Sequence, residues 1–142
     1  MIKSFVLSLT LVMTTVSFGD ELSASYAEVQ YLQGVMYDTG KGVQQNSQEA
    51  LRLYILAAER DHGAAQIMLG VMYAEGSGVS LDYVLAYMWF SLAARQVAED
   101  AKRYRVKIAR SMTSDQIAHA QQLVREWLEE HPRSSAPIEK NR

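Results

Sequence analysis

Two stretches of the chain, GVMYDTGKGV at residues 34–43 and GVMYAEGSGV at residues 70–79, are nearly identical and lie 36 residues apart. Aligned without gaps, residues 28–63 and 64–99 agree at twelve of 36 positions. A repeat of this length with helical spacing of apolar residues is typical of stacked helical hairpins. The sequence therefore predicts an all-α fold, a right-handed α-solenoid of two helix-turn-helix repeats at 28–63 and 64–99.

The positions that the two repeats share define the parts of one hairpin. Gly34 and Gly70 fall inside the first helix, where glycine costs about 1 kcal/mol, so we expect another helix to cross closely there. The Gly-x-Gly that follows supplies positive φ for a tight turn. Asn46 and Asp82 are suited to cap the second helix, with Glu49 completing a capping box. The framework positions are Gly34, Tyr37, Gly40, Gly42 and Ala50, then Gly70, Tyr73, Gly76, Gly78, Ala86, Trp89 and Ala93.

These residues resemble the Sel-one-like repeat, a relative of the tetratricopeptide repeat built from antiparallel helix pairs. The family pattern is matched within residues 65–94 by Ala65, Leu69, Gly70, Met72, Tyr73, Gly76, Gly78, Val79, Asp82, Ala86, Trp89, Phe90, Ala93 and Ala94. Residues 29–58 depart from it, with Val29, Gln33 and Leu53 where the family has Ala, Leu and Trp. The family also closes the second helix with glycine, where this chain has Asp61 and Val97.

The first nineteen residues have the pattern of a secretory signal peptide. Lys3 precedes an uncharged stretch at residues 4–19, which ends with the small residues Ser17 and Gly19. We expect cleavage before Asp20 and export to the periplasm or the cell exterior. The alternative is an uncleaved anchor, but the stretch is shorter than the ~20 apolar residues that span a bilayer, so no stable membrane insertion is expected after cleavage.

The mature domain is predicted to be a single unit, residues 20–131, followed by a flexible tail at 132–142. Its last part, 100–131, is expected to cap the solenoid as a helix pair. Ala101, Tyr104 and Ile108 should face inward, and Thr113 with Gln116 should form a capping box. The basic run 102–110 faces outward as a solvated surface; the alternative is that it binds an anionic lipid, nucleic acid or polysaccharide.

Composition excludes several kinds of chemistry. The formal net charge of −2 argues against a general nucleic-acid binder, and the chain has no cysteine for disulfides, thiolate metal sites or nucleophiles. The glycine turns lack the Walker A spacing. Glu59 and His62 form only one of the paired motifs that a di-iron bundle needs, so the histidines are expected to lie on the surface. We predict no catalytic residue, no cofactor and no metal site.

The resemblance implies a non-enzymatic adaptor that binds a protein or peptide in the bacterial envelope or outside the cell. In tetratricopeptide-like stacks the first helices line the concave side, so a partner groove is predicted there, apolar at its centre and acidic at its rim. An alternative is that the N-terminal segment 20–27 or the C-terminal cap folds into this groove, so that its residues belong to the core. The groove residues are Glu28, Tyr31, Val35 and Thr39 in the first repeat and Ala64, Ile67, Val71 and Glu75 in the second.

Two different functions compete with the adaptor. One is a small secreted hydrolase or β-lactam-binding protein of the Sel-one-like type, although such relatives are cysteine-rich and this chain has no cysteine. The second is a structural protein that self-associates. The absence of cysteine favours the adaptor over the hydrolase.

Overall fold

The computed structural model describes the backbone of residues 2–132 and the side chains of residues 19–97 and 99–132. Within residues 2–132 the chain forms six helices and no strand, which confirms the all-α class. The helices are α1 (Ile2–Thr39), α2 (Ser47–Ala58), α3 (Gly63–Glu75), α4 (Tyr83–Ala93), α5 (Ala98–Ala109) and α6 (Ser114–Glu130).

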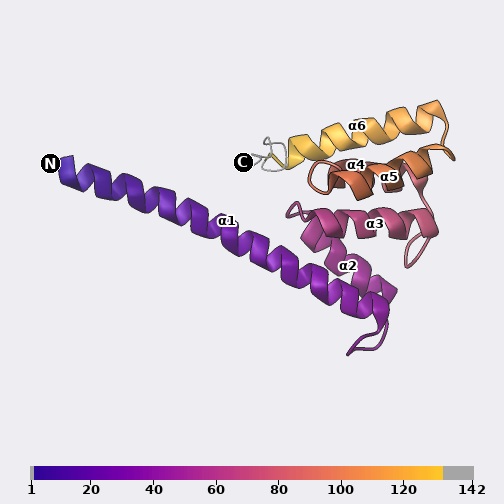
Figure 1. The fold of residues 1–142 in the computed structure, drawn as a ribbon, viewed down its shortest axis with the longest axis horizontal. Coiled ribbons are helices and arrows are strands. Elements are labelled where there is room, and N and C mark those ends of the chain that lie inside the picture. The colour runs from indigo at the N-terminus through magenta and orange to yellow at the C-terminus, as the bar shows by residue number, and fades with distance from the viewer. Residues whose placement is uncertain (1, 133–142) are drawn as a thin grey trace.

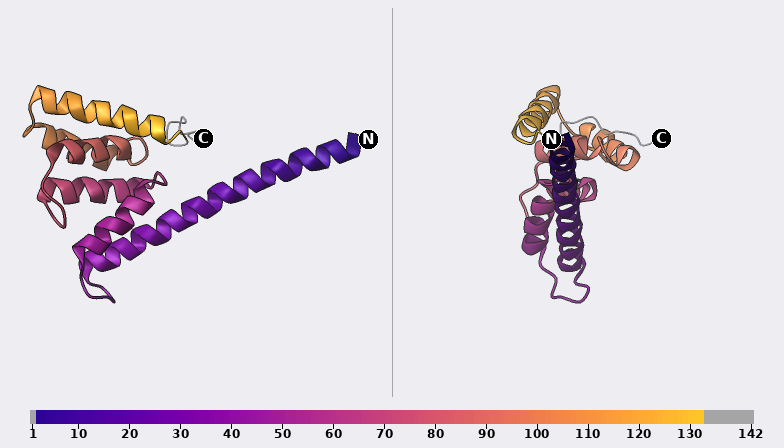
Figure 2. Two further views of the ribbon diagram at one scale, coloured as in Figure 1. Left: turned by 180° about the vertical axis from the view of Figure 1, so that it is seen from behind. Right: turned by 90° about the vertical axis from the view of Figure 1, so that its left-hand side faces the viewer.

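The helices stack in chain order as a solenoid (Figure 1). The C-terminal part of α1 pairs with α2, and α3 pairs with α4, while α2 contacts α3 and α4 contacts both α5 and α6. Each second helix of a hairpin therefore lies between its own first helix and the next one. Two further views show the N-terminal part of α1 projecting from this stack (Figure 2). The predicted signal peptide falls mostly on residues 1–18, whose side chains lie outside the described ones, so its cleavage stays a prediction.

Both glycine turns adopt the left-handed backbone that the sequence predicts. Gly40 and Gly42 have φ of 70° and 78°, and Gly76 and Gly78 have φ of 69° and 72°. The turn after α2 uses a non-glycine residue, Asp61, at φ 62°. Its counterpart after α4 is Val97, which keeps φ at −108°. The two hairpins therefore join their neighbours differently, as expected from a β-branched residue that disfavours positive φ.

The close approach predicted at the helical glycines is present in both hairpins. A Cβ atom built on Gly34 would lie 2.6 Å from Cε1 of Tyr54, and one on Gly70 would lie 2.4 Å from Cε1 of Phe90. In each case the neighbour is an aromatic ring from the second helix of the same hairpin. The glycine cost inside α1 and α3 is thus offset by close packing of a buried ring.

The helix caps are as expected, with one exception. Asn46 accepts hydrogen bonds from the backbone N–H groups of Gln48 and Glu49 at the start of α2, and Asp82 accepts from that of Leu85 at the start of α4. The predicted capping box at Glu49 is wrong. Its carboxylate instead binds the Arg52 guanidinium, with Oε1 2.6 Å from an Nη atom, and this hydrogen bond lowers the pKa of Glu49.

The start of α6 and its packing close the C-terminal end. Thr113 and Gln116 form the predicted capping box. Trp127 of α6 packs edge-on against Trp89 of α4, with ring centroids 6.3 Å apart. The two C-terminal helices thus cover α4, the last helix of the second repeat.

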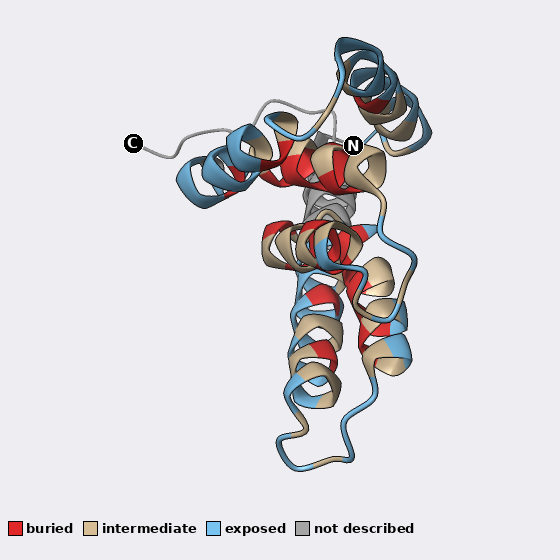
Figure 3. Cartoon of the chain, turned by 90° about the vertical axis from the view of Figure 1, so that its right-hand side faces the viewer, coloured by how far each residue is buried: buried red, intermediate tan, exposed pale blue. Residues whose placement is uncertain are grey.

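The core follows the small and aromatic positions of the repeats. Buried residues lie on the sides where helices face one another, and exposed residues lie outside (Figure 3). One cluster joins α1, α2, α3 and α4, and a smaller one, around Ala86, Phe90 and Ile108, joins α4 and α5. Among the described residues, no helix is both long enough and apolar enough to cross a membrane.

Candidate functional site

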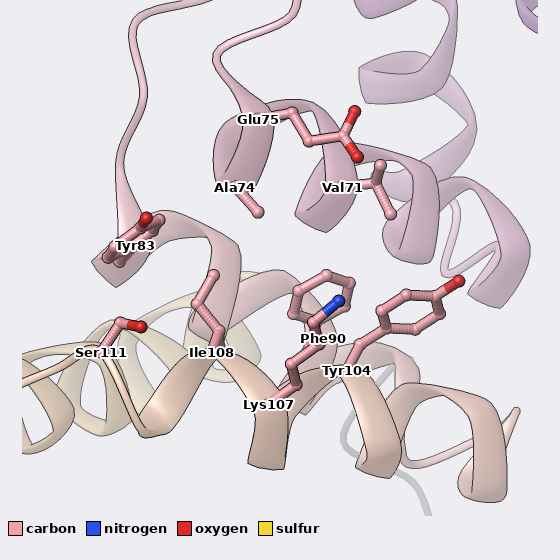
Figure 4. A pocket seen from close by; sticks show the side chains of 9 residues that line it. All are labelled: Val71, Ala74, Glu75, Tyr83, Phe90, Tyr104, Lys107, Ile108 and Ser111. Carbon is pink, nitrogen blue, oxygen red and sulfur yellow. The ribbon is translucent and has the colours of Figure 1, made fainter.

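A hollow lies between α3 and α5, with α4 as its floor (Figure 4). Its volume is about 280 Å³. Helix α5 packs against α4 but has few contacts with α3, so the two helices form walls that stand apart. The lining residues are Val71, Ala74 and Glu75 of α3, Tyr83 and Phe90 of α4, Tyr104, Lys107 and Ile108 of α5, and Ser111.

Aromatic rings form the base of this α3–α5 hollow. Phe90 is buried, and its ring stacks on Tyr104 with centroids 5.2 Å apart and planes 11° apart. Tyr104 itself is 39% exposed, so one side of the stack is open to solvent. An apolar hollow with an accessible aromatic face is suited to hold an apolar or aromatic side chain of a partner.

Charges stand at the rim of the hollow rather than at its base. Glu75 projects from α3, and Lys107 from α5 on the facing wall (Figure 4). Both side chains are exposed. The rim thus presents one acid and one base, an arrangement that orients a bound segment through its flanking charges.

A second, wider hollow of about 570 Å³ lies between α1 and the start of α3. Glu28 and Tyr31 reach it from α1, and Ala64 from α3. His62 also lines it and stacks on Tyr31, with ring centroids 4.8 Å apart. Polar residues that line this hollow bind one another: His62 contacts Glu28, and Gln96 donates a hydrogen bond to the Asp61 carbonyl. The hollow is therefore mainly a contact region between α1 and the start of α3.

The structure places the predicted groove residues in two separate regions. Glu28, Tyr31 and Ala64 line the α1–α3 hollow, whereas Val71 and Glu75 line the α3–α5 hollow. The other three do not line either hollow. Val35 packs against the larger core cluster, Ile67 packs against the smaller one, and Thr39 donates a hydrogen bond to the Val35 carbonyl at 2.7 Å.

The expectation that the histidines lie on the surface is wrong for His62, whose side chain is 16% exposed. Its Nδ1 accepts a hydrogen bond from the Ala65 N–H at 3.2 Å and so caps α3. Its Nε2 lies 2.8 Å from a carboxylate oxygen of Glu28. Because Nδ1 accepts, the ring proton is on Nε2 and is donated to Glu28. The short link between α2 and α3 places this histidine at a helix start rather than on an open surface.

The described side chains provide no metal centre. No group of three or more histidines and carboxylates among them is arranged to hold an ion. Glu59 and His62 have the three-residue spacing of a di-iron ligand pair in the sequence. In the structure Glu59 is exposed, and His62 binds Glu28 instead.

The sequence patterns did not predict that α5 forms one wall of the α3–α5 hollow. Shifting α3 by 36 residues gives 99–111, nearly the range of α5, although α5 has no Gly-x-Gly turn. Helix α5 packs on α4 as α3 packs on α2. The signal available in the sequence is the pair Tyr104 and Ile108, which the spacing predicts to face inward. Ile108 is buried, but Tyr104 is exposed on one side of its stack on Phe90, because α3 stands apart from α5 and does not cover it.

Stacked hairpins with glycine turns and small-residue contacts define this chain as a short α-solenoid, a class of repeat protein. Residues 27–62 and 63–96 each match the family model of the Sel1 repeat. The chain belongs to the Sel1 repeat family, and the repeat boundaries agree with the 36-residue offset of the sequence.

Two solved structures share this fold. One is c5321, a protective antigen present in uropathogenic Escherichia coli strains that displays an SLR fold, with a TM-score of 0.74 and 30% identity. The match covers 82% of this chain and 25% of that one. The other is a Sel1 repeat protein from Oxalobacter formigenes, with a TM-score of 0.56 and 34% identity over 66% of this chain and 37% of that one. This chain therefore spans only about a quarter and somewhat over a third of these proteins. No curated protein matches it.

Proposed function

We propose that this chain is a non-enzymatic adaptor that binds a segment of a partner protein in the α3–α5 hollow. Sel1 repeat proteins are generally protein–protein interaction modules. The observation that supports this particular site is the open Phe90–Tyr104 stack at the base of an apolar hollow. The partner segment is expected to insert an apolar side chain there.

The first nineteen residues bear on where the protein acts. Lys3, the uncharged stretch 4–19 and the small residues before Asp20 support export, and we infer a role in the bacterial cell envelope or outside the cell. An intact-mass measurement on the envelope fraction tests this part. A chain that begins at Asp20 is expected, and a chain that keeps residues 1–19 would contradict cleavage.

The site is tested by filling it. Ala74 is a small, half-buried side chain on the wall of the hollow, so Ala74→Arg should block entry of a partner side chain. Ala118→Arg, on the exposed face of α6, adds the same side chain away from the hollow and is the matched control. In-cell cross-linking with mass spectrometry should recover the same partners with the control as with the unmodified chain and lose them with Ala74→Arg.

A folded Ala74→Arg protein that keeps its partners would contradict the site. Circular dichroism and the melting temperature show whether each variant is folded, and Tyr104→Ser offers a second way to remove the aromatic face. Turnover of any envelope hydrolase substrate by the purified protein would contradict the non-enzymatic role.

A further inference from the structure

The outer side of α1 carries a row of exposed apolar side chains. Five of the nine large hydrophobic residues that are exposed in the described chain lie on this helix. They follow one another at three- or four-residue spacing and so share one face. The row, here called the α1 stripe, consists of Leu22, Tyr26, Val29, Leu32 and Met36, with exposed fractions of 44, 63, 48, 50 and 40%.

The equivalent face of α3, in the second repeat, is covered by another helix. Ala65 and Met72 of α3 are buried, and Met68 packs against the same core cluster, which includes Ala57 and Ala58 of α2. In the second repeat, therefore, a helix covers the face that is open in the first. The 36-residue offset pairs Val29 with Ala65, Leu32 with Met68 and Met36 with Met72.

The charges beside the stripe select the kind of helix. Glu21 and Glu28 lie seven residues apart and are exposed, and helix geometry places them beside Leu32 along one edge of the stripe, whereas Asp20 and Asp38 lie on the opposite side of α1. Between residues 20 and 39 the chain has no lysine or arginine. From this placement we propose that the α1 stripe docks an amphipathic helix of another protein that carries lysine or arginine along the edge of its apolar face next to Glu21 and Glu28. This surface lies apart from the α3–α5 hollow, and the proposal does not depend on binding in that hollow.

Gln33 adds a requirement on that helix. It is exposed and lies within the stripe, where the second repeat has the fully buried Leu69. A buried amide without a hydrogen-bond partner is costly, so the docked helix must bring a polar side chain to this point. A single polar group in an apolar seam also fixes the register of two helices.

A second copy of this chain fits the stripe less well than a basic helix does. Two α1 stripes packed antiparallel would set Glu21 and Glu28 of one copy beside those of the other, and like charges repel. The basic outer face of α5 would match in charge, but it offers only Val106 as an exposed large apolar side chain. Neither surface supplies both the apolar row and the opposite charge.

The test uses the full chain and a designed helical peptide of about 18 residues, long enough to follow the four turns from Leu22 to Met36. The peptide carries leucines on one face, lysines on its flanks and one central glutamine. The double variant Val29→Ser, Leu32→Ser removes the centre of the stripe. Because both side chains are exposed, its helicity and melting temperature should stay close to those of the unmodified chain. Val106→Ser is the control, since Val106 is 54% exposed, on a different helix.

Fluorescence anisotropy should show at least tenfold weaker peptide binding by the double variant and unchanged binding by Val106→Ser. A peptide of the same composition without an apolar face should bind much more weakly than the amphipathic one. Equal binding by the double variant, or by the reordered peptide, would overturn the proposal. Dimers that form in light scattering and vanish in the double variant would assign the stripe to a second copy and overturn the basic-helix partner.

Discussion

At the scale of single residues, two glycine–aromatic contacts hold the hairpins together. Gly34 faces Tyr54 and Gly70 faces Phe90, in both cases too closely for a Cβ atom. The aromatic rings are buried, so they have little room to move. The identity of the residue at these two positions is therefore set by the facing ring and not by helix propensity.

Replacement of Gly70 by alanine tests this contact. Alanine gains about 1 kcal/mol in helix propensity. A Cβ atom 2.4 Å from the buried Phe90 ring should cost about 2–3 kcal/mol, the upper part of the range for overpacking a filled core, so a net loss of about 1–2 kcal/mol is expected. Chemical denaturation measures it. In a Phe90→Leu background the same replacement should cost less than about 0.5 kcal/mol, because the facing ring is gone. A Gly70→Ala protein as stable as the original would contradict close packing at this position.

Tyr54 makes stability depend on pH in the alkaline range. Burial raises the pKa of its phenol, and the nearby Asp38 carboxylate raises it further. The folded protein therefore holds this proton more tightly than the unfolded chain does. Its contribution is complete below the unfolded pKa of about 10 and declines as the pH rises above that value.

The melting temperature should accordingly fall as the pH is raised from about 9 to about 11. Tyr54→Phe should make this decline shallower, whereas Tyr26→Phe, at an exposed position, should not. The same decline in all three proteins would show that Tyr54 does not account for it.

At the scale of elements, local patterns were sufficient for much of the fold. The Gly-x-Gly turns and the caps Asn46, Asp82 and Thr113 each depend on residues close in sequence, and the structure shows them. The spacing of Glu49 fits a capping box, but Arg52, three residues later, binds its carboxylate. A spacing rule does not decide which of two nearby partners a side chain takes.

Trp127 of α6 contacts Trp89 on α4 and stacks on His131, with ring centroids 6.3 and 4.0 Å apart. Trp127 is half-buried, so Trp127→Ala should lower the free energy of unfolding by about 1–3 kcal/mol, less than for a fully buried tryptophan. Trp127→Phe should retain most of this energy. Urea denaturation followed by circular dichroism measures both, and an unchanged midpoint for Trp127→Ala would show that the contact between Trp127 and Trp89 does not stabilise the fold.

At the scale of the whole molecule, the candidate site was only partly foreseeable. The predicted groove combined α1 and α3 into one surface, because the sequence shows which residues share a helix face but not how far apart two helices stand. In the structure Val71 and Glu75 face α5 across a hollow, while Glu28 and Tyr31 meet His62 at a joint. Helix α5 forms a wall of the hollow because it packs against α4. No repeat pattern in residues 98–109 predicts this packing.

Site-specific photo-cross-linking in the producing cell shows whether a partner segment enters the α3–α5 hollow, as we propose. A photoreactive amino acid is placed at Lys107, on the rim of the hollow, or at Gln121, on the exposed side of α6. We expect a discrete protein adduct from position 107 that Ala74→Arg abolishes, and none from position 121. No adduct at 107, or an adduct that persists with the hollow filled, would contradict the proposal.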